Sequence, residues 1–375
     1  GPAFIIGLLV AGLIATFNAL SSAQLAANYP HSGGTYEYGY ILLNPSLGFS
    51  AGWMFLISKL TAAGVVALGF GSYFHQLLPI ASPITFSVVA VIFLTAANYF
   101  GVKKAGKLNF LIVTITLLTL IYLVFSGIPQ VNPENFKPFA PFGISGIAEA
   151  AALLFFAFTG YARIATLAEE VVEPKKTIPR AIIITTITAI ILYLAISIIA
   201  IGVIGAEQMA LSISPLQVVA NALSTPGVSI AITIGASTAM LGVLLSQILG
   251  ISRMMLAMGR RNDLPPFFKT IHKRYQIPHI GIFITGGIIL LLSIIGSFEF
   301  IVRAATFTIL LYYSITNIAA IKQPRSERMY GRLVPVLGLI GCLAMSVSLP
   351  LNVIASGVGL LLIGFVVRFL FHRIS

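Results

Sequence analysis

Long apolar runs recur from one end of the chain to the other, and they constrain its fold more than any other feature. They are about 18 to 25 residues long, close to the roughly 20 residues that a helix needs to cross the hydrocarbon core of a bilayer. Only 9% of the 375 residues are charged and 58% are hydrophobic, whereas soluble domains carry about 25% charged residues. The chain is therefore predicted to be an all-α polytopic membrane protein.

The hydropathy pattern divides the chain into eleven predicted transmembrane spans. The spans cover residues 3–28, 46–77, 83–101, 108–127, 144–171, 179–205, 226–256, 279–296, 298–321, 332–349 and 351–371. The gap at Gly296-Ser297 is short, but it separates two runs that together are too long for one span.

The positions of the basic residues orient these spans. Eighteen of the 22 Lys and Arg residues lie in alternate loops, at the helix ends beside them or at the C-terminus, and only Lys137 lies on the opposite side. Cytoplasmic loops are enriched in Lys and Arg. The basic side and the C-terminus are therefore predicted to be cytoplasmic, in a multi-pass protein of the plasma membrane. This bias accounts for the net charge of +12, so no nucleic-acid partner is expected.

Three basic residues, Lys59, Arg163 and Arg303, fall within predicted spans. A basic group at mid-bilayer costs about 3 kcal/mol on insertion scales, so it usually faces the bundle interior or a water-filled path. Lys59 is predicted either to bond a carbonyl or a neighbouring helix, or to line the substrate or proton path. Arg163 is predicted either to hold backbone carbonyls in place by hydrogen bonds, as a structural clamp, or to line the substrate or coupling path. Arg303 follows Glu299 by one turn, a spacing that favours an ion pair.

The run 144–171 is long enough to span a membrane, but Thr159-Gly160 interrupts it and Arg163 follows. An interruption at bilayer depth leaves backbone groups unpaired, which is tolerated only where the gap is packed in protein or lines a wet cavity. Secondary transporters hold their substrates at such breaks. The neighbouring aromatic residues would ordinarily belong to the core, but beside a break Phe156 is a candidate gate. The interruption predicts a transporter.

Residues for other kinds of chemistry are sparse. The five His and ten acidic residues are scattered, without the spacing of a metal site, a nucleophile or a phosphate-binding loop. The single cysteine, Cys342, lies in an apolar run and cannot form an intrachain disulfide. No catalytic residue, cofactor or metal is therefore expected, and neither an enzyme nor a channel with repeated polar rings is favoured.

Four segments carry a resemblance to a known family. They are AQLAANYPHSGGTYEYGY at 23–40, Gly52-Trp53, FFAFTGYARIATLAEEVVEPKKTIPRAI at 155–182, and LGISRMMLAMGRRNDLPPFF at 249–268 with Pro-His at 278–279. In this order they resemble the amino acid-polyamine-organocation (APC) superfamily of transporters, although Gln24 stands where the family usually has an acid.

The resemblance implies a five-plus-five inverted-repeat transporter fold, with about eleven of an expected twelve helices present. The implied divisions are a first repeat at 1–127 that lacks its first helix, an extracellular loop at 128–143, a second repeat at 144–321 that contains the broken helix 144–171, and two additional helices at 322–375. The family's first helix, which supplies amides to the substrate carboxylate, is expected before Gly1. The chain is therefore expected to be a fragment that holds half of the site.

The resemblance also implies which residues form that half. In the family, the break of the sixth helix offers backbone carbonyls to the substrate amino group. The matching residues here are Phe156, Ala157, Phe158 and Thr159, with Gly160 giving the turn, and the interruption of the span independently indicates the same residues.

Two familiar functional residues are absent from the chain. Proton-coupled relatives can carry a lysine in the fifth helix, where this chain has Thr116, and some relatives have an acid where this chain has Ala162. We hypothesise that Lys59 takes the place of these residues as the group that binds and releases a proton, because burial disfavours its charged form.

The predicted function is secondary active transport of amino acids by alternating access. Two basic groups in the bundle and no acid beside the break favour neutral amino acids, with proton coupling favoured over sodium, or with exchange. A non-transporting amino acid-binding receptor and a transporter of another small amine or organic cation are the alternatives. The expected partners are the amino acid and the lipid bilayer, and no oligomeric state is predicted.

Overall fold

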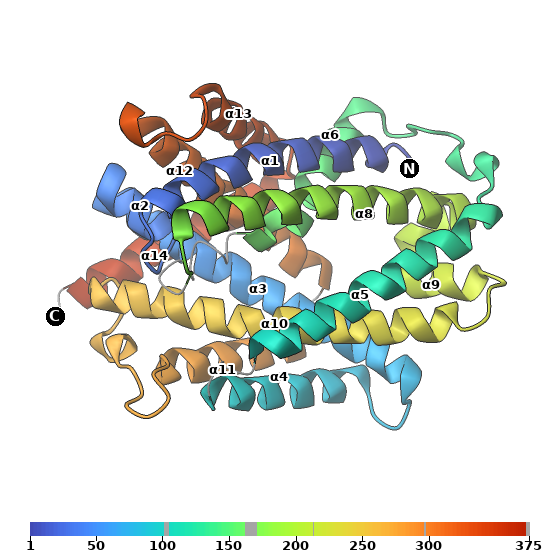
Figure 1. Cartoon of the computed structure of the whole chain (residues 1–375), viewed down its shortest axis with the longest axis horizontal. Coiled ribbons are helices and arrows are strands. Elements are labelled where there is room, and N and C mark those ends of the chain that lie inside the picture. The colour runs from blue at the N-terminus through green and yellow to red at the C-terminus, as the bar shows by residue number, and fades with distance from the viewer. Residues whose placement is uncertain (101–104, 162–170, 213, 296–297, 373–375) are drawn as a thin grey trace.

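The protein is a bundle of helices that run side by side along its longest axis (Figure 1). The computed structural model describes residues 1–100, 105–161, 171–212, 214–295 and 298–372. Over those residues the ordered elements are α-helices and short 3₁₀-helices, without a strand. The predicted all-α class is therefore confirmed.

Each of the eleven predicted spans overlaps an observed α-helix, although α6 covers only the first part of the predicted span 144–171. These helices are α1 (Phe4–Asn28), α3 (Pro45–Leu77), α4 (Pro83–Tyr99), α5 (Ala105–Gly127), α6 (Gly143–Phe155), α8 (Pro174–Leu211), α10 (Val228–Arg260), α11 (His279–Ile295), α12 (Phe298–Lys322), α13 (Leu333–Val347) and α14 (Leu351–His372). The predicted helix boundary at Gly296-Ser297 lies outside the described residues.

Shorter elements connect the long helices. They are α2 (Thr35–Leu42), η2 (Ile128–Gln130), η3 (Pro133–Phe136), η4 (Phe156–Tyr161), α9 (Pro215–Ala222), η6 (Pro266–Lys269) and η7 (Arg325–Glu327). Among these elements, η4 lies where the sequence predicts an interruption of the span 144–171.

Among the described residues, 7 helical stretches are long and apolar enough to cross a membrane, and α4, α11 and α13 are shorter apolar helices. Such helices identify a multi-pass membrane protein. The count of eleven spans and the inverted repeat remain predictions.

Local sequence explains where several helices begin and bend. At the start of α3, the Asn44 side chain accepts a hydrogen bond from the backbone N–H of Leu47, and Pro45 occupies the first turn. Ser82 and Pro83 begin α4 in the same way. Both pairs follow the usual N-terminal preferences of helices. Gly205 has a φ of 77° and bends α8, at the residue where the predicted span ends.

Small residues allow α1 to pack closely inside the bundle. Ala11, Ala15, Ala19 and Ala23 recur every four residues and are each at most 2% exposed. They lie on one face of the helix, and α1 packs against α6, α8 and α13. Close approach through small side chains is a common way to associate helices within a membrane.

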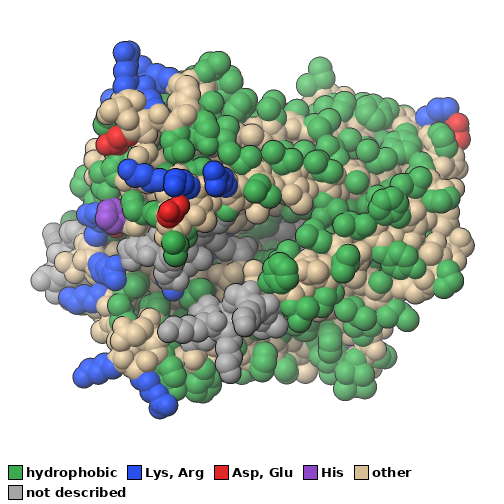
Figure 2. Space-filling view, viewed as in Figure 1, with side chains coloured by type: hydrophobic (Ala, Val, Ile, Leu, Met, Phe, Trp, Pro, Cys, Tyr) green, Lys and Arg blue, Asp and Glu red, His purple; other side chains and the backbone are tan. Residues whose placement is uncertain are grey.

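Basic side chains gather at the end of the molecule that holds the C-terminus, and a broad hydrophobic surface covers the middle (Figure 2). At that end the carboxylate of Asp263 is completely buried. It accepts hydrogen bonds from the hydroxyls of Tyr36 and Tyr40 and from Arg368 Nε at 2.8 Å. Burial and the neighbouring carboxylate raise the pKa of both tyrosines. This network joins α2, the end of α10 and α14.

A second ion pair lies nearby but is more exposed. Arg261 contacts Glu37 at 2.6 Å, and the two side chains are 38% and 12% exposed. In the first pair Arg368 and Asp263 are 16% and 0% exposed. The two pairs therefore differ mainly in how well they are shielded from water.

We expect Arg368→Met to destabilise the fold strongly, because it leaves the Asp263 carboxylate buried without its cation. Removing one partner of a buried pair costs about 3 to 5 kcal/mol. Arg261→Met is the matched control and should cost about 1 kcal/mol or less. Thermal unfolding of the detergent-solubilised protein measures both. Equal losses in the two variants would contradict the assignment, whereas adding Asp263→Asn to Arg368→Met should recover part of the stability.

Candidate functional site

The α-helix α6 ends at Phe155, and the tighter 3₁₀-helix η4 continues the chain from Phe156 to Tyr161. The hydroxyl of Thr159 donates to the carbonyl of Phe156 at 2.8 Å, a local bond that competes with regular helix formation. Along η4, Phe158 packs on Tyr193 of α8, whereas Tyr161 packs on Tyr313 of α12.

Lys59 of α3 is hydrogen-bonded to η4, the element that forms the break in the helix. Its ammonium donates to the carbonyl and to the hydroxyl of Thr159, both at 3.1 Å, and lies 5.8 Å from the centre of the Phe55 ring. Lys59 is 2% exposed, as expected for a cation within the bundle. The carbonyl of Thr159 thus receives a charged donor, which makes the stronger kind of hydrogen bond.

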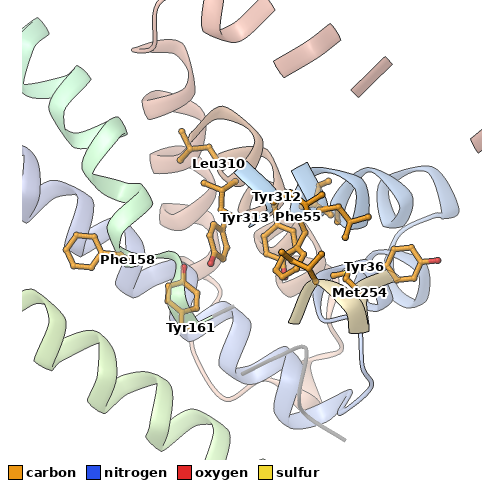
Figure 3. Packing of buried hydrophobic residues seen from close by; sticks show 14 of the residues in the cluster. Tyr36, Phe55, Phe158, Tyr161, Met254, Leu310, Tyr312 and Tyr313 are labelled. Atoms are coloured by element: carbon orange, nitrogen blue, oxygen red, sulfur yellow. The ribbon is translucent and has the colours of Figure 1, made fainter. Parts of the chain in front are cut away.

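Tyr313 of α12 supports the same carbonyl from another side. Its hydroxyl lies 3.4 Å from the oxygen of Thr159, and its ring packs 5.2 Å from that of Tyr161 and 5.6 Å from that of Phe155. Figure 3 shows Tyr161 and Tyr313 close together, with Phe158 on the other side of the ribbon. The break is therefore held by side chains from two helices that are distant in sequence.

A cavity of about 470 Å³ opens beside the break, between α5, η4, α8 and α10. This volume lies within the range of about 300 to 1,000 Å³ that is typical of small-molecule sites. Seven lining residues carry hydroxyl or amide groups: Asn109, Thr116, Tyr161, Thr185, Thr186, Tyr193 and Ser246. The described lining residues include no Asp, Glu, Lys, Arg or His. The described lining is therefore largely apolar, with a few hydroxyl and amide groups.

The structure brings some of the predicted site residues to this cavity and not others. Ala157, Phe158, Gly160 and Thr116 line it. Phe156 is not among the lining residues and packs, partly buried, against the core.

The remaining predicted residues lie elsewhere or cannot be placed. Thr159 is 4% exposed and is bonded to Lys59 on the side of α3. Arg163 lies outside the described residues, as do the side chains of Arg303 and Glu299. The predicted clamp and ion pair therefore remain predictions.

Sequence reasoning missed Tyr193 and Tyr313. Tyr193 lies on α8, where its hydroxyl donates to the carbonyl of Ala157 at 3.3 Å and its ring packs 5.2 Å from that of Phe158. The only available signal was that each is a hydroxyl-bearing aromatic within a long apolar run. That signal does not show which distant carbonyl such a hydroxyl meets.

Known proteins similar to this chain share nearly all of its length. The family model described as amino acid permease matches residues 1–373. An uncharacterized transporter of Mycobacterium tuberculosis (strain ATCC 25618 / H37Rv) is 36% identical over 366 residues, which cover 97% of this chain and 82% of the relative. The branched-chain amino acid permease of Bacillus subtilis (strain 168) is 29% identical over 401 residues, with 100% and 86% covered.

A more distant relative carries a different name. The low-affinity putrescine importer of Escherichia coli (strain K12) is 25% identical over 320 residues, which cover 82% of this chain and 70% of the relative. These relatives are therefore named for different substrates, branched-chain amino acids in one case and putrescine in the other.

We expect Ala157→Cys to react with methyl methanethiosulfonate, because Ala157 is exposed in the cavity beside the break. Ala152→Cys, five residues earlier and 0% exposed, is the matched control and should react far more slowly. The native Cys342 is buried, so its own reaction with the reagent should be slow. Mass spectrometry of the intact protein follows the reaction. An unmodified Ala157→Cys, or equal rates in both variants, would show that the cavity is closed to solvent.

Proposed function

The chain belongs to the amino acid permease family, which confirms the superfamily that its motifs resemble, and we propose that it is a secondary active transporter of neutral amino acids. The family and the names of its relatives indicate a transporter rather than an enzyme. The observation that carries the neutral preference is the cavity beside the broken helix, whose described lining has no ionisable side chain apart from its tyrosines.

The chemistry of the lining supports this preference. An amino acid needs acceptors for its ammonium, and a broken helix supplies backbone carbonyls. A cationic side chain would need a second acceptor with negative charge, since burying an unpaired charge is strongly unfavourable. Apolar residues and hydroxyls instead fit a neutral side chain. The name of the Bacillus relative, a branched-chain amino acid permease, is in line with this choice.

Alternating access follows from the fold that the resemblance implies. We propose residues 1–127 and 144–321 as the two halves of an inverted repeat, 128–143 as the extracellular loop, and 322–375 as two additional helices. The broken helix would rock against the helices beside it, with Phe156 as the candidate gate. The bond between Lys59 and Thr159 crosses the boundary between the break and α3, so it would change during this motion.

We propose the plasma membrane as the location and the cytoplasm as the side of the C-terminus. The support is the concentration of basic side chains at the end that holds the C-terminus (Figure 2), together with the tendency of Lys and Arg to remain on the cytoplasmic side.

Protons are the proposed coupling ion, in preference to sodium. A protonated lysine has three donors, and two of the bonds made by Lys59 hold the carbonyl and hydroxyl of Thr159. Loss of the proton would weaken the tie between α3 and the break. Tyr313 on α12 shares the carbonyl of Thr159 and approaches it from another helix.

We expect Lys59→Met to abolish the stimulation of uptake by an inward proton gradient, because methionine fills similar space but cannot hold a proton. Uptake into proteoliposomes with and without the gradient measures the effect. Thr159→Val, which keeps the lysine and the carbonyl but removes the hydroxyl, should retain the stimulation. An unchanged pH profile in Lys59→Met would rule out Lys59 as the coupling residue.

We expect Gly160→Val to weaken binding by about 5- to 150-fold, because the added side chain takes space that the bound ligand needs, and overfilling an occupied site costs about 1 to 3 kcal/mol. Gly160 lines the cavity, and a β-carbon built there meets nothing within 4 Å, so the protein should still fold. Gly287→Val on α11 is the control, since it also has open space and lies away from the cavity. Equilibrium binding of labelled amino acid distinguishes them, and equal affinities would exclude this cavity as the site.

Uptake of labelled leucine, glutamate, lysine and putrescine into proteoliposomes tests the proposed function itself. Leucine uptake that exceeds the others is the expected result. Preferential uptake of lysine or putrescine would favour a transporter of cationic amines, and saturable leucine binding without uptake would indicate a receptor.

A further inference from the structure

The loop between α10 and α11 carries three exposed basic side chains, Lys269, Lys273 and Arg274. Within the described residues, none of the three lies within ion-pair distance of a carboxylate. The segment 264–278 contains neither Asp nor Glu. Neighbouring positive charges repel one another, and an anion between them removes that repulsion. The loop is therefore a positive surface whose charges its own segment does not balance.

Contacts with the ends of α10 and α4 hold this loop in a defined shape. Phe268 is 7% exposed and lies against Gly259 of α10. The ring of His272 accepts a hydrogen bond from the backbone N–H of Tyr275 at 3.2 Å, and it lies 5.5 Å from the ring of Tyr99 at the end of α4. The basic side chains therefore project from a packed, hydrogen-bonded backbone.

The loop adjoins a large apolar surface. Helices α4 and α11 pack against each other at one edge of the bundle, and the loop lies beyond their ends (Figure 1). Six apolar side chains of these helices are more than half exposed: Val89, Ile92, Phe93, Phe283, Leu291 and Ile294. In the loop itself, Phe267 and Ile271 are 48% and 41% exposed. Contiguous exposed apolar surface marks a site of contact with a membrane or a partner.

We propose that the loop 264–278 binds the headgroup of an anionic phospholipid, whose acyl chains lie along α4 and α11. The three basic side chains hold the phosphate, and an arginine suits it because a guanidinium donates two parallel hydrogen bonds. The guanidinium of Arg274 lies 5.5 Å from the centre of the Tyr275 ring, which restricts its position. Basic pockets beside transmembrane helices bind anionic headgroups in this way.

The combination of charge and apolar surface favours a lipid over a soluble anion. An acidic soluble partner would account for the three basic residues, but not for the exposed apolar side chains that continue from the loop onto two membrane-spanning helices. A phospholipid matches both, because its charged headgroup and its acyl chains meet at the boundary where the loop meets the helices. The inference does not depend on which substrate the protein transports.

Native mass spectrometry of the detergent-solubilised protein tests the proposal with phosphatidylglycerol and phosphatidylcholine of identical acyl chains. The native protein should bind phosphatidylglycerol more tightly. A variant with Lys269→Gln, Lys273→Gln and Arg274→Gln should lose about 100-fold of this affinity. The single variant Lys273→Gln should lose about 5-fold, the equivalent of about 1 kcal/mol for each basic residue at a membrane surface.

The matched control replaces three other basic residues by glutamine, Lys175, Lys176 and Arg180 at the start of α8. Both triple variants lose the same net charge. The segment 169–173 just before the control residues holds three acids, and Lys176 pairs with Glu173 at 3.4 Å. Because local acids already balance these basic residues, the control should lose less than about 5-fold in affinity for phosphatidylglycerol.

Three results would overturn the proposal: equal losses in the two triple variants, equal affinity of the native protein for the two phospholipids, or binding of glycerol phosphate as tight as that of phosphatidylglycerol. The last result would identify a soluble phosphate as the ligand. Thermal unfolding in phosphatidylcholine should be the same for all variants, because the substituted side chains are exposed. If the triple variant unfolds earlier, Lys273→Gln alone decides, and an unchanged affinity in that variant would overturn the proposal.

Discussion

Backbone groups within a membrane need hydrogen-bond partners, and the broken helix of this protein obtains them from side chains. The bond between the Lys59 ammonium and Thr159 is the central example, because it gives a carbonyl of the break a charged donor and gives a buried cation an acceptor. A lysine at this depth is costly without an acceptor, and an interrupted helix is costly without donors. Each feature makes the other possible, and together they fix where α3 meets the break.

The other partners of the break determine the shape of the candidate site. Tyr313 approaches Thr159 from α12, so one side of η4 is fully packed. Tyr193 approaches Ala157 from α8, and that side opens into the cavity. The two sides therefore differ: one is bonded to α3 and α12, and the other faces the cavity. At the basic end, the buried Asp263, which follows α10, is joined to α2 through Tyr36 and to α14 through Arg368.

Much of the fold was predictable because its signals are local. Asn44-Pro45 marks a helix start, the length of each apolar run matches a helix, and Thr159-Gly160 marks the interruption. The depth of Lys59 also followed from its position within a span. The partners were not predictable, because Lys59 and Thr159 lie 100 residues apart and Tyr193 resembles any core aromatic. Sequence periodicity therefore located the break, but only packing showed that Ala157 faces a cavity whereas Thr159 faces Lys59.

A structure determined experimentally with leucine bound would test the central claim most directly, since that claim concerns where the ligand lies. The account predicts leucine in the cavity between α5, α8 and α10, with its ammonium at hydrogen-bond distance from a backbone carbonyl of η4 and with Lys59 still bonded to Thr159. Leucine bound away from the break, or an ammonium that has replaced Lys59 at Thr159, would contradict it.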